Sequence, residues 1–184
     1  MENNQADLSQ YRSDFGLKNK LARVLWNSTY LLLFRPFGTR FFKKYRVFIL
    51  KCFGAKLEYT SHIYASVRIW APWNLTMGSY STLGPAVDCY NQGNIYIGDQ
   101  TTISQKSYLC ASTHDFTKID FPLTCKPIQI GNSVWIAADS FVGPGVIIGD
   151  GAVAGARSAI FKNVDPWTVV GGNPARIIKQ RILE

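Results

Sequence analysis

The stretch PIQIGNSVWIAADSFVGPGVIIGDGAVAGARSAI, from Pro127 to Ile160, carries a period of six residues. An aliphatic side chain recurs at every sixth position, and a glycine or alanine follows each of the first five. The repeated positions are Ile130, Ile136, Val142, Ile148, Ala154 and Ile160. A fixed short period is typical of a solenoid, in which every repeat buries its apolar side chain against its neighbours. Alternation over only three residues indicates very short strands, and the small residue allows a tight corner after each strand.

Three hexads predict one turn of a triangular parallel β-helix, so residues eighteen apart in this stretch should stack on each other. The chain from residue 63 keeps the same three columns with small insertions. The predicted stacks are Ile130 on Ile148, Ile136 on Ala154, Val142 on Ile160, Met77 on Ile97, Leu83 on Ile103 and Cys89 on Leu109. A β-sandwich would need longer strands with sustained alternation, which this region lacks. We therefore predict an all-β solenoid over residues 63–164.

Residues 1–62 differ in composition and predict a helical, basic cap. Residues 1–60 hold eleven Lys and Arg against four acidic residues. Apolar side chains follow helical spacing in two segments, the second of which ends near Gly54. These positions are Leu17, Leu21, Val24, Leu25 and Leu32, then Phe41, Phe42, Tyr45, Phe48, Ile49 and Cys52. We favour a packed cap with a solvated basic face, and peripheral contact with a membrane surface is the alternative.

Other features exclude several classes of protein. The polar start lacks the order of a signal peptide, and Arg35 and Pro36 interrupt the apolar run TYLLLF, so we expect a cytoplasmic protein. The four cysteines have no zinc-finger spacing, and the chain has only two histidines, so we expect no metal site. No nucleic-acid recognition motif accompanies the basic charge, so we expect no nucleic-acid partner.

The hexads stop between Leu109 and Ile128, and residues 111–127 form a long excursion that contains His114. Long loops on a rigid scaffold often hold reactive groups. A histidine there can act as a general base toward a hydroxyl, since its ordinary pKa is near neutral. A hydrogen-bonded structural role for His114 is the alternative, and His62 is interpreted as structural.

Residues 165–184 leave the repeat. Pro166 and the sequence GGNP turn the chain, and Pro174 followed by Arg176, Lys179 and Arg181 predicts a short basic C-terminal helix. Such a segment could hold phosphates or simply cover the open end of the solenoid.

The stretch KPIQIGNSVWIAADSFVGPGVIIGDGAVAGARSAI, together with VDPWTVVGGNPARIIK, resembles the hexapeptide-repeat acyltransferases, a left-handed β-helix family of sugar and antibiotic acetyltransferases. The sequences LLFRPFG and SVRIWAPWNLTMG are closer to its colanic acid and exopolysaccharide branch. The resemblance implies a left-handed solenoid, acetyl-CoA as acyl donor and a carbohydrate acceptor. It also implies a homotrimer whose active sites lie between subunits.

The same resemblance assigns roles to individual residues. His114 would be the base, and the acetyl-CoA site would be formed by Trp135, Ala138, Ala156, Lys162, Arg176 and Lys179. The family's acceptor-binding Asn is replaced here by Gly84 or Ala86, so Asp88 and Asn91 are the nearest polar candidates for acceptor binding.

We thus expect a cytoplasmic O-acetyltransferase of surface polysaccharide synthesis, with peripheral contact at the inner membrane face as the alternative for its cap. The alternatives are an antibiotic or small-metabolite acetyltransferase and a non-catalytic β-helix scaffold. A zinc-dependent carbonic anhydrase of this fold would need three histidines, one more than the chain has.

Overall fold

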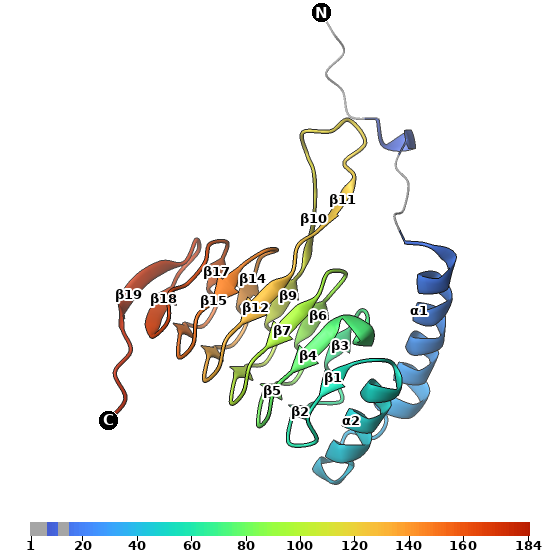
Figure 1. Cartoon of the computed structure of the whole chain (residues 1–184), viewed down its shortest axis with the longest axis horizontal. Helices are drawn as coiled ribbons and strands as arrows, with labels where there is room; N and C mark the ends of the chain where they lie inside the picture. The colour runs from blue at the N-terminus through green and yellow to red at the C-terminus, as the bar shows by residue number, and fades with distance from the viewer. Residues whose placement is uncertain (1–6, 11–14) are drawn as a thin grey trace, which may run out of the picture.

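The computed structural model describes residues 7–10 and 15–184, which form a parallel β-solenoid with helices at its N-terminal end (Figure 1). Its short strands fall into three faces. Face A contains β1 (Lys56–Leu57), β4 (Leu75–Met77), β7 (Ile95–Ile97), β12 (Ile128–Ile130) and β15 (Ile147–Ile148). Face B contains β2 (His62–Ile63), β5 (Thr82–Leu83), β8 (Thr102–Ile103), β13 (Trp135–Ile136), β16 (Val153–Ala154), β18 (Thr168–Gly171) and β19 (Arg176–Gln180). Face C contains β3 (Arg68–Ile69), β6 (Asp88–Tyr90), β9 (Tyr108–Cys110), β14 (Phe141–Val142) and β17 (Ala159–Ile160).

The stacking predicted from the hexads is confirmed. All six predicted pairs are aligned in parallel registers, three in the unbroken run and three in the earlier coils. Each member of these pairs is at most 3% exposed. The three columns form the hydrophobic core. Complete burial of one such aliphatic side chain contributes about 1.5–3 kcal/mol to the free energy of folding. The first coil begins at β1, a few residues before the expected boundary at residue 63.

Buried hydroxyl groups stabilise the corners between faces. Ser81 Oγ donates to the carbonyl of Gly98 at 2.5 Å, and Thr101 Oγ1 donates to that of Gly131 at 2.7 Å. Gly98 itself leaves no room for a side chain, because a Cβ there would lie 2.7 Å from the Gly131 carbonyl oxygen. The Ser and Thr positions two residues before an aliphatic position thus connect one coil to the next.

The N-terminal cap contains the predicted helices. α1 (Leu17–Thr29) continues into the π-helical turn η2 (Tyr30–Phe34), and η3 (Arg40–Phe42) leads into α2 (Lys43–Cys52). Two further short 3-10 turns are η1 (Leu8–Gln10) and η4 (Pro72–Asn74). α1 packs on face C, where the Trp26 indole donates to the Ile69 carbonyl at 2.7 Å, and α2 packs on β1 and β2.

The cap helices pack on the solenoid, and α1 does so through a side that the spacing of its leucines did not indicate. Leu17, Leu21, Val24, Leu25 and Leu32 are between 61% and 72% exposed, so the apolar face read from the sequence points outward. The inward face of α1 and η2 contains the aromatic residues Trp26, Tyr30 and Phe34. The helix is apolar on two opposite sides, and the larger aromatic side chains occupy the side that packs on the solenoid. Apolar side chains also point outward around α2, where Phe41 of the preceding turn η3 and Phe48 of the helix itself are exposed.

Arg46 of α2 departs from the solvated basic face predicted for the cap, because it is only 1% exposed. Its Nε donates to the carbonyl of Ile63 at 2.8 Å, and its Nη1 donates to those of Phe37 at 2.6 Å and Thr39 at 3.0 Å. The guanidinium therefore ties α2 and the preceding loop to β2. Buried charge is tolerated here because carbonyl oxygens satisfy it.

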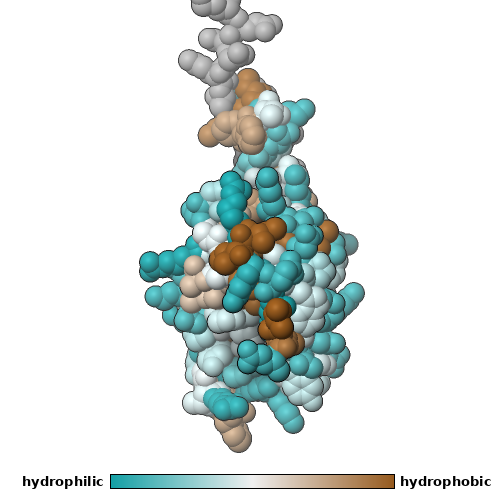
Figure 2. All heavy atoms as spheres, turned by 90° about the vertical axis from the view of Figure 1, so that its left-hand side faces the viewer, coloured by the Kyte–Doolittle hydropathy of each residue, from teal (hydrophilic) through white to brown (hydrophobic). Residues whose placement is uncertain are grey.

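The predicted C-terminal helix is wrong, since residues 176–180 form strand β19. β19 pairs antiparallel with β18, and a bulge lies between Val169 and Val170. The β-branched Ile177 and Ile178 favour a strand, and the Ile178 side chain occupies the space above Gly171. Beyond the strand, Arg181 Nη1 donates to the carbonyls of Ser133 and Gly151, each at 2.8 Å. Figure 2 faces this C-terminal end, where apolar side chains form small separate groups among polar ones.

Replacing Arg46 with alanine should lower the free energy of unfolding by about 3 kcal/mol, because the carbonyls of Ile63, Phe37 and Thr39 lose a charged donor that lies in the core. Lys44→Ala, on the exposed side of the same helix, should change it by less than about 0.5 kcal/mol. Urea denaturation of both variants measures the difference. Equal stability of the two variants would show that the guanidinium does not hold the cap.

Candidate active site

The excursion at residues 111–127 is a β-hairpin that projects from the solenoid (Figure 1). Its strands are β10 (Ser112–His114) and β11 (Leu123–Cys125), with His114 opposite Leu123. The Asp7 amide donates to the Ile119 carbonyl at 2.8 Å, so the N-terminal segment touches the hairpin tip. The predicted loop is therefore an ordered arm rather than an irregular one.

The His114 ring is exposed and oriented by the backbone. Its Nδ1 lies 2.6 Å from the carbonyl oxygen of Phe121, which can only accept, so Nδ1 carries the proton. In neutral imidazole the lone pair then resides on Nε2. The backbone of Phe121 has a φ of 46°, a left-handed conformation that is unusual for an aromatic residue. This geometry suits a base that accepts a proton at Nε2.

Trp135 lies on the opposite side of the solenoid from the hairpin. The hairpin leaves the corner between faces C and A, whereas Trp135 points outward from β13 on face B. The indole is 49% exposed, and its Nε1 donates to Ser104 Oγ at 3.0 Å. A triangular cross-section places face B across from the C–A corner. One chain therefore does not bring His114 and Trp135 together.

Ala138 and Ala156 lie at consecutive corners between faces B and C, beside Trp135. The amide of Arg157 donates to the Ala138 carbonyl at 2.9 Å, which stacks the two corners directly. An ion pair of 3.3 Å between Arg157 Nε and Asp139 Oδ2 strengthens the same edge. The small side chains leave this edge of the backbone accessible to an extended ligand.

Lys162 and Arg176 line one groove of about 590 Å³ at the C-terminal end. Lys162 comes from the corner after β17, and Arg176 begins β19. The groove also contains apolar walls from Phe161 and Ile177. Lys179 lies further along β19, opposite Val169. Two cations over a partly apolar groove can bind phosphate groups joined to an apolar arm.

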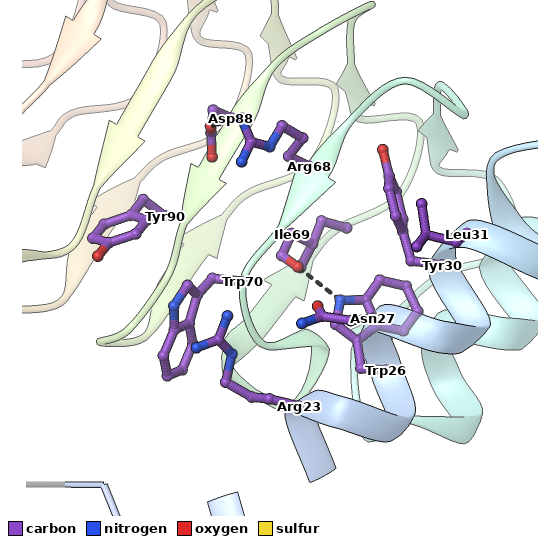
Figure 3. A pocket seen from close by; sticks show the side chains of 10 residues that line it. All are labelled: Arg23, Trp26, Asn27, Tyr30, Leu31, Arg68, Ile69, Trp70, Asp88 and Tyr90. Atoms are coloured by element: carbon purple, nitrogen blue, oxygen red, sulfur yellow. Dashed lines mark hydrogen bonds and ion pairs between the residues drawn. The ribbon is translucent and has the colours of Figure 1, made fainter. Parts of the chain in front are cut away.

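A second cavity, of about 580 Å³, lies between α1 and face C (Figure 3). Asp88 and Tyr90 of β6 form one wall, and Arg23 of α1 stacks over the Trp70 ring at 3.9 Å from its centroid. Asp88 Oδ2 lies 3.7 Å from Arg68 Nη1. Partial burial raises the pKa of the Asp88 carboxyl above its ordinary value, and Arg68 opposes that change. Aromatic rings beside carboxylate and guanidinium groups can bind a polyhydroxylated ligand.

Comparison with known proteins places these features in a family. The chain is 41% identical over 178 residues to a protein of Escherichia coli (strain K12) named as the colanic acid biosynthesis acetyltransferase WcaF, covering 96% of this chain and 97% of the relative. A chloramphenicol acetyltransferase of Klebsiella aerogenes is 53% identical over 113 residues, which are 60% of this chain and 53% of that protein. No family model matches the sequence.

The chain belongs to the hexapeptide-repeat acetyltransferase family. Its fold matches a hexapeptide-repeat acetyltransferase of Vibrio cholerae, solved with acetyl coenzyme A, with a TM-score of 0.81 at 22% identity over 93% of each chain. Mirror-image solenoids do not superpose, so the two wind with the same hand. The 41% identity to an acetyltransferase over 96% of the chain identifies this hexapeptide-repeat acetyltransferase as an acyltransferase.

The sequence did not indicate that Arg23 and Trp70 line a cavity of this hexapeptide-repeat acetyltransferase together with Asp88. Arg23 Nε is buried without a hydrogen-bond partner among the described residues, and burial lowers its pKa. Its place among residues with helical spacing hid it, because no sequence signal indicates that α1 crosses face C at Trp70. Asn91, a predicted acceptor residue, is fully buried instead, and its side-chain amide bonds both the N–H and the carbonyl of Ala71.

His62 was interpreted as structural in this hexapeptide-repeat acetyltransferase, and it lies on β2 with its ring stacked on Tyr64 at a centroid distance of 4.6 Å. Burial and then Lys43 lower the pKa of the His62 ring. Among the described residues, no three His, Cys, Asp or Glu side chains are grouped as metal ligands would be.

Proposed function

We propose that the protein transfers an acetyl group from acetyl-CoA to a sugar hydroxyl during exopolysaccharide synthesis. The observation that carries the proposal is His114, whose Nδ1 is anchored on the Phe121 carbonyl and whose Nε2 holds the lone pair. A base of this kind serves a reaction that removes a proton from a hydroxyl. The full-length similarity to WcaF supports the polysaccharide setting.

The reaction needs no covalent enzyme intermediate. His114 Nε2 accepts the acceptor's hydroxyl proton as the oxygen attacks the thioester carbonyl. Collapse of the tetrahedral intermediate breaks the carbon–sulfur bond, and the departing thiolate takes the proton from the imidazolium. The products are an O-acetyl ester and CoA.

The acetyl-CoA site would use the edge beside Trp135 and the groove at the C-terminal end. Ala138 and Ala156 would let the pantetheine arm lie along the backbone, and Lys162, Arg176 and Lys179 would meet the phosphates. The pairing of Lys162 and Arg176 in one groove supports this arrangement.

The complete site would lie between subunits of a homotrimer. The hairpin of one chain leaves the corner opposite face B, on which Trp135 of the same chain lies, so a neighbour would have to supply one of them. Cyclic three-fold symmetry would produce three identical sites from one kind of contact.

The acceptor would bind in the cavity between α1 and face C. Trp70 and Tyr90 would contact the sugar rings, and Asp88 and Arg23 would bind hydroxyl or acidic groups. Since Asn91 is buried and paired, we assign it to the fold rather than to the acceptor. We place the enzyme in the cytoplasm, peripheral at the inner membrane face through its N-terminal helices.

An antibiotic acceptor is the second candidate, favoured by the 53% identity to a chloramphenicol acetyltransferase over 113 residues. A panel of acceptors incubated with acetyl-CoA, followed by thiol release, decides between the two. We expect turnover with oligosaccharide or lipid-linked sugar acceptors and none with chloramphenicol. Turnover with chloramphenicol alone would support the second candidate.

The substitution His114→Ala should reduce kcat by roughly two orders of magnitude or more, the usual contribution of a general base. Binding of CoA, measured by calorimetry, should stay close to wild type because the proposed phosphate contacts of Lys162, Arg176 and Lys179 are unchanged. The control His62→Ala, which removes the other histidine, should retain most of its turnover. A wild-type rate in His114→Ala would remove the residue from the mechanism.

The substitution Arg176→Ala should raise the KM for acetyl-CoA roughly tenfold with kcat nearly unchanged, since phosphate contacts act equally on the ground and transition states. Arg40→Ala, which removes an exposed guanidinium from the cap, should leave KM unaltered. Steady-state kinetics with varied acetyl-CoA measures both. An unchanged KM in Arg176→Ala would place the CoA phosphates elsewhere.

A further inference from the structure

The outward face of α1 and η2 carries an apolar stripe. It consists of Leu17, Leu21, Val24, Leu25, Leu31 and Leu32, which recur at intervals of three, four and seven residues and are each at least 58% exposed. We call these six residues the outer stripe. Such spacing places them on one side of a helix. Exposed apolar patches of this extent mark interaction sites, whereas single exposed apolar residues need no explanation.

The charge around the outer stripe has one sign. From Leu17 to Leu57 the chain contains ten Lys and Arg residues and no Asp or Glu. Lys18 and Lys20 lie beside the stripe on the first turn of α1 and are exposed, and Arg35 and Arg40 follow η2 and are also exposed. The cap therefore combines exposed leucines with uncompensated positive charge.

Charge complementarity identifies the partner as an anionic surface. A second copy of this chain would bring two basic caps together and leave their charges in repulsion. A bilayer with anionic headgroups offers apolar acyl chains to the leucines and phosphates to the lysines and arginines. No described helix is long and apolar enough to cross a membrane, so the helix would lie in the interface plane.

We infer that α1 and η2 dock the protein on an anionic lipid bilayer through the outer stripe. The contact would immerse the outer stripe in the headgroup and acyl boundary while the inner side of the same helix stays on face C. The inner side also supplies Arg23, Asn27 and Tyr30 to the cavity proposed for the acceptor (Figure 3). On that proposed function, docking brings the acceptor cavity to the lipid surface, where a membrane-anchored sugar would reach it.

The test uses the full-length protein and vesicles made either from equal parts of phosphatidylcholine and phosphatidylglycerol or from phosphatidylcholine alone. Flotation should recover wild-type protein with the anionic vesicles, and added salt should weaken that binding. The double substitution Leu21→Ser with Leu25→Ser should lower the partition coefficient at least roughly tenfold, because two immersed leucines are lost. Lys18→Gln with Lys20→Gln should lower it by roughly fivefold for each lysine removed.

The matched control is Ile182→Ser with Leu183→Ser, which removes two exposed apolar side chains from the C-terminal tail. This control should bind vesicles as wild type does, and circular dichroism should confirm that all variants are folded. Failure of wild type to float, or equal flotation of the leucine variant, would overturn the proposal. A changed oligomeric state of that variant with unchanged flotation would also overturn it, in favour of contact between copies.

The vesicle experiment contains no acetyl-CoA, so its outcome does not depend on the proposed acetyl transfer. With a soluble oligosaccharide acceptor the leucine variant should keep the wild-type rate, because Leu21 and Leu25 do not line the acceptor cavity. With a vesicle-anchored acceptor the same variant should lose rate in proportion to its lost binding. Failure of turnover with every acceptor would instead refute the proposed function and leave docking intact.

Discussion

Parallel stacking of short strands that point apolar residues inward is the constraint on which the rest of this molecule depends. Every coil buries its three columns only because the coils before and after it bury theirs. Hydroxyl groups inside the corners connect successive coils, as Ser81 does with Gly98 and Thr101 with Gly131. The result is a rigid triangular prism whose faces and corners hold functional groups at fixed separations. A single interruption of this regularity produces the His114 hairpin.

The solenoid and the hairpin position were predictable from the sequence because both follow from periodicity and its interruption. The column partners, such as Ile130 with Ile148, come from counting residues, and the register confirms them. The termini were less predictable for physical reasons. Residues 176–180 carry both helix and strand preferences, and the open edge of β18 decided in favour of the strand. α1 is apolar on two sides, so its spacing could not reveal that Trp26 and not Leu25 would pack inward.

The candidate site shows a similar division. His114 could be found because it lies where the repeat stops, and its orientation comes from the Phe121 carbonyl, which no sequence pattern indicates. Lys162 and Arg176 were predicted by resemblance, and the structure brings them to one groove. The second cavity is lined by Arg23 of α1, by Trp70, which follows β3, and by Asp88 of β6. Local sequence spacing could not predict a contact between segments so far apart in the chain. Asn91 was predicted to bind the acceptor, but its side-chain amide is hydrogen-bonded to the backbone of Ala71 instead.

The central claim is that one chain's His114 works with the Trp135 edge of its neighbour. Mixing two inactive variants and reassembling them tests it most directly, with His114→Ala lacking the base and Ala156→Trp blocking the edge. Random mixed trimers from equal amounts should recover about a quarter of wild-type activity per site, since a functional site needs an intact base from one subunit and an intact edge from the next. If each subunit contains its own complete site, the reassembled mixture should remain inactive, and that result would contradict the account.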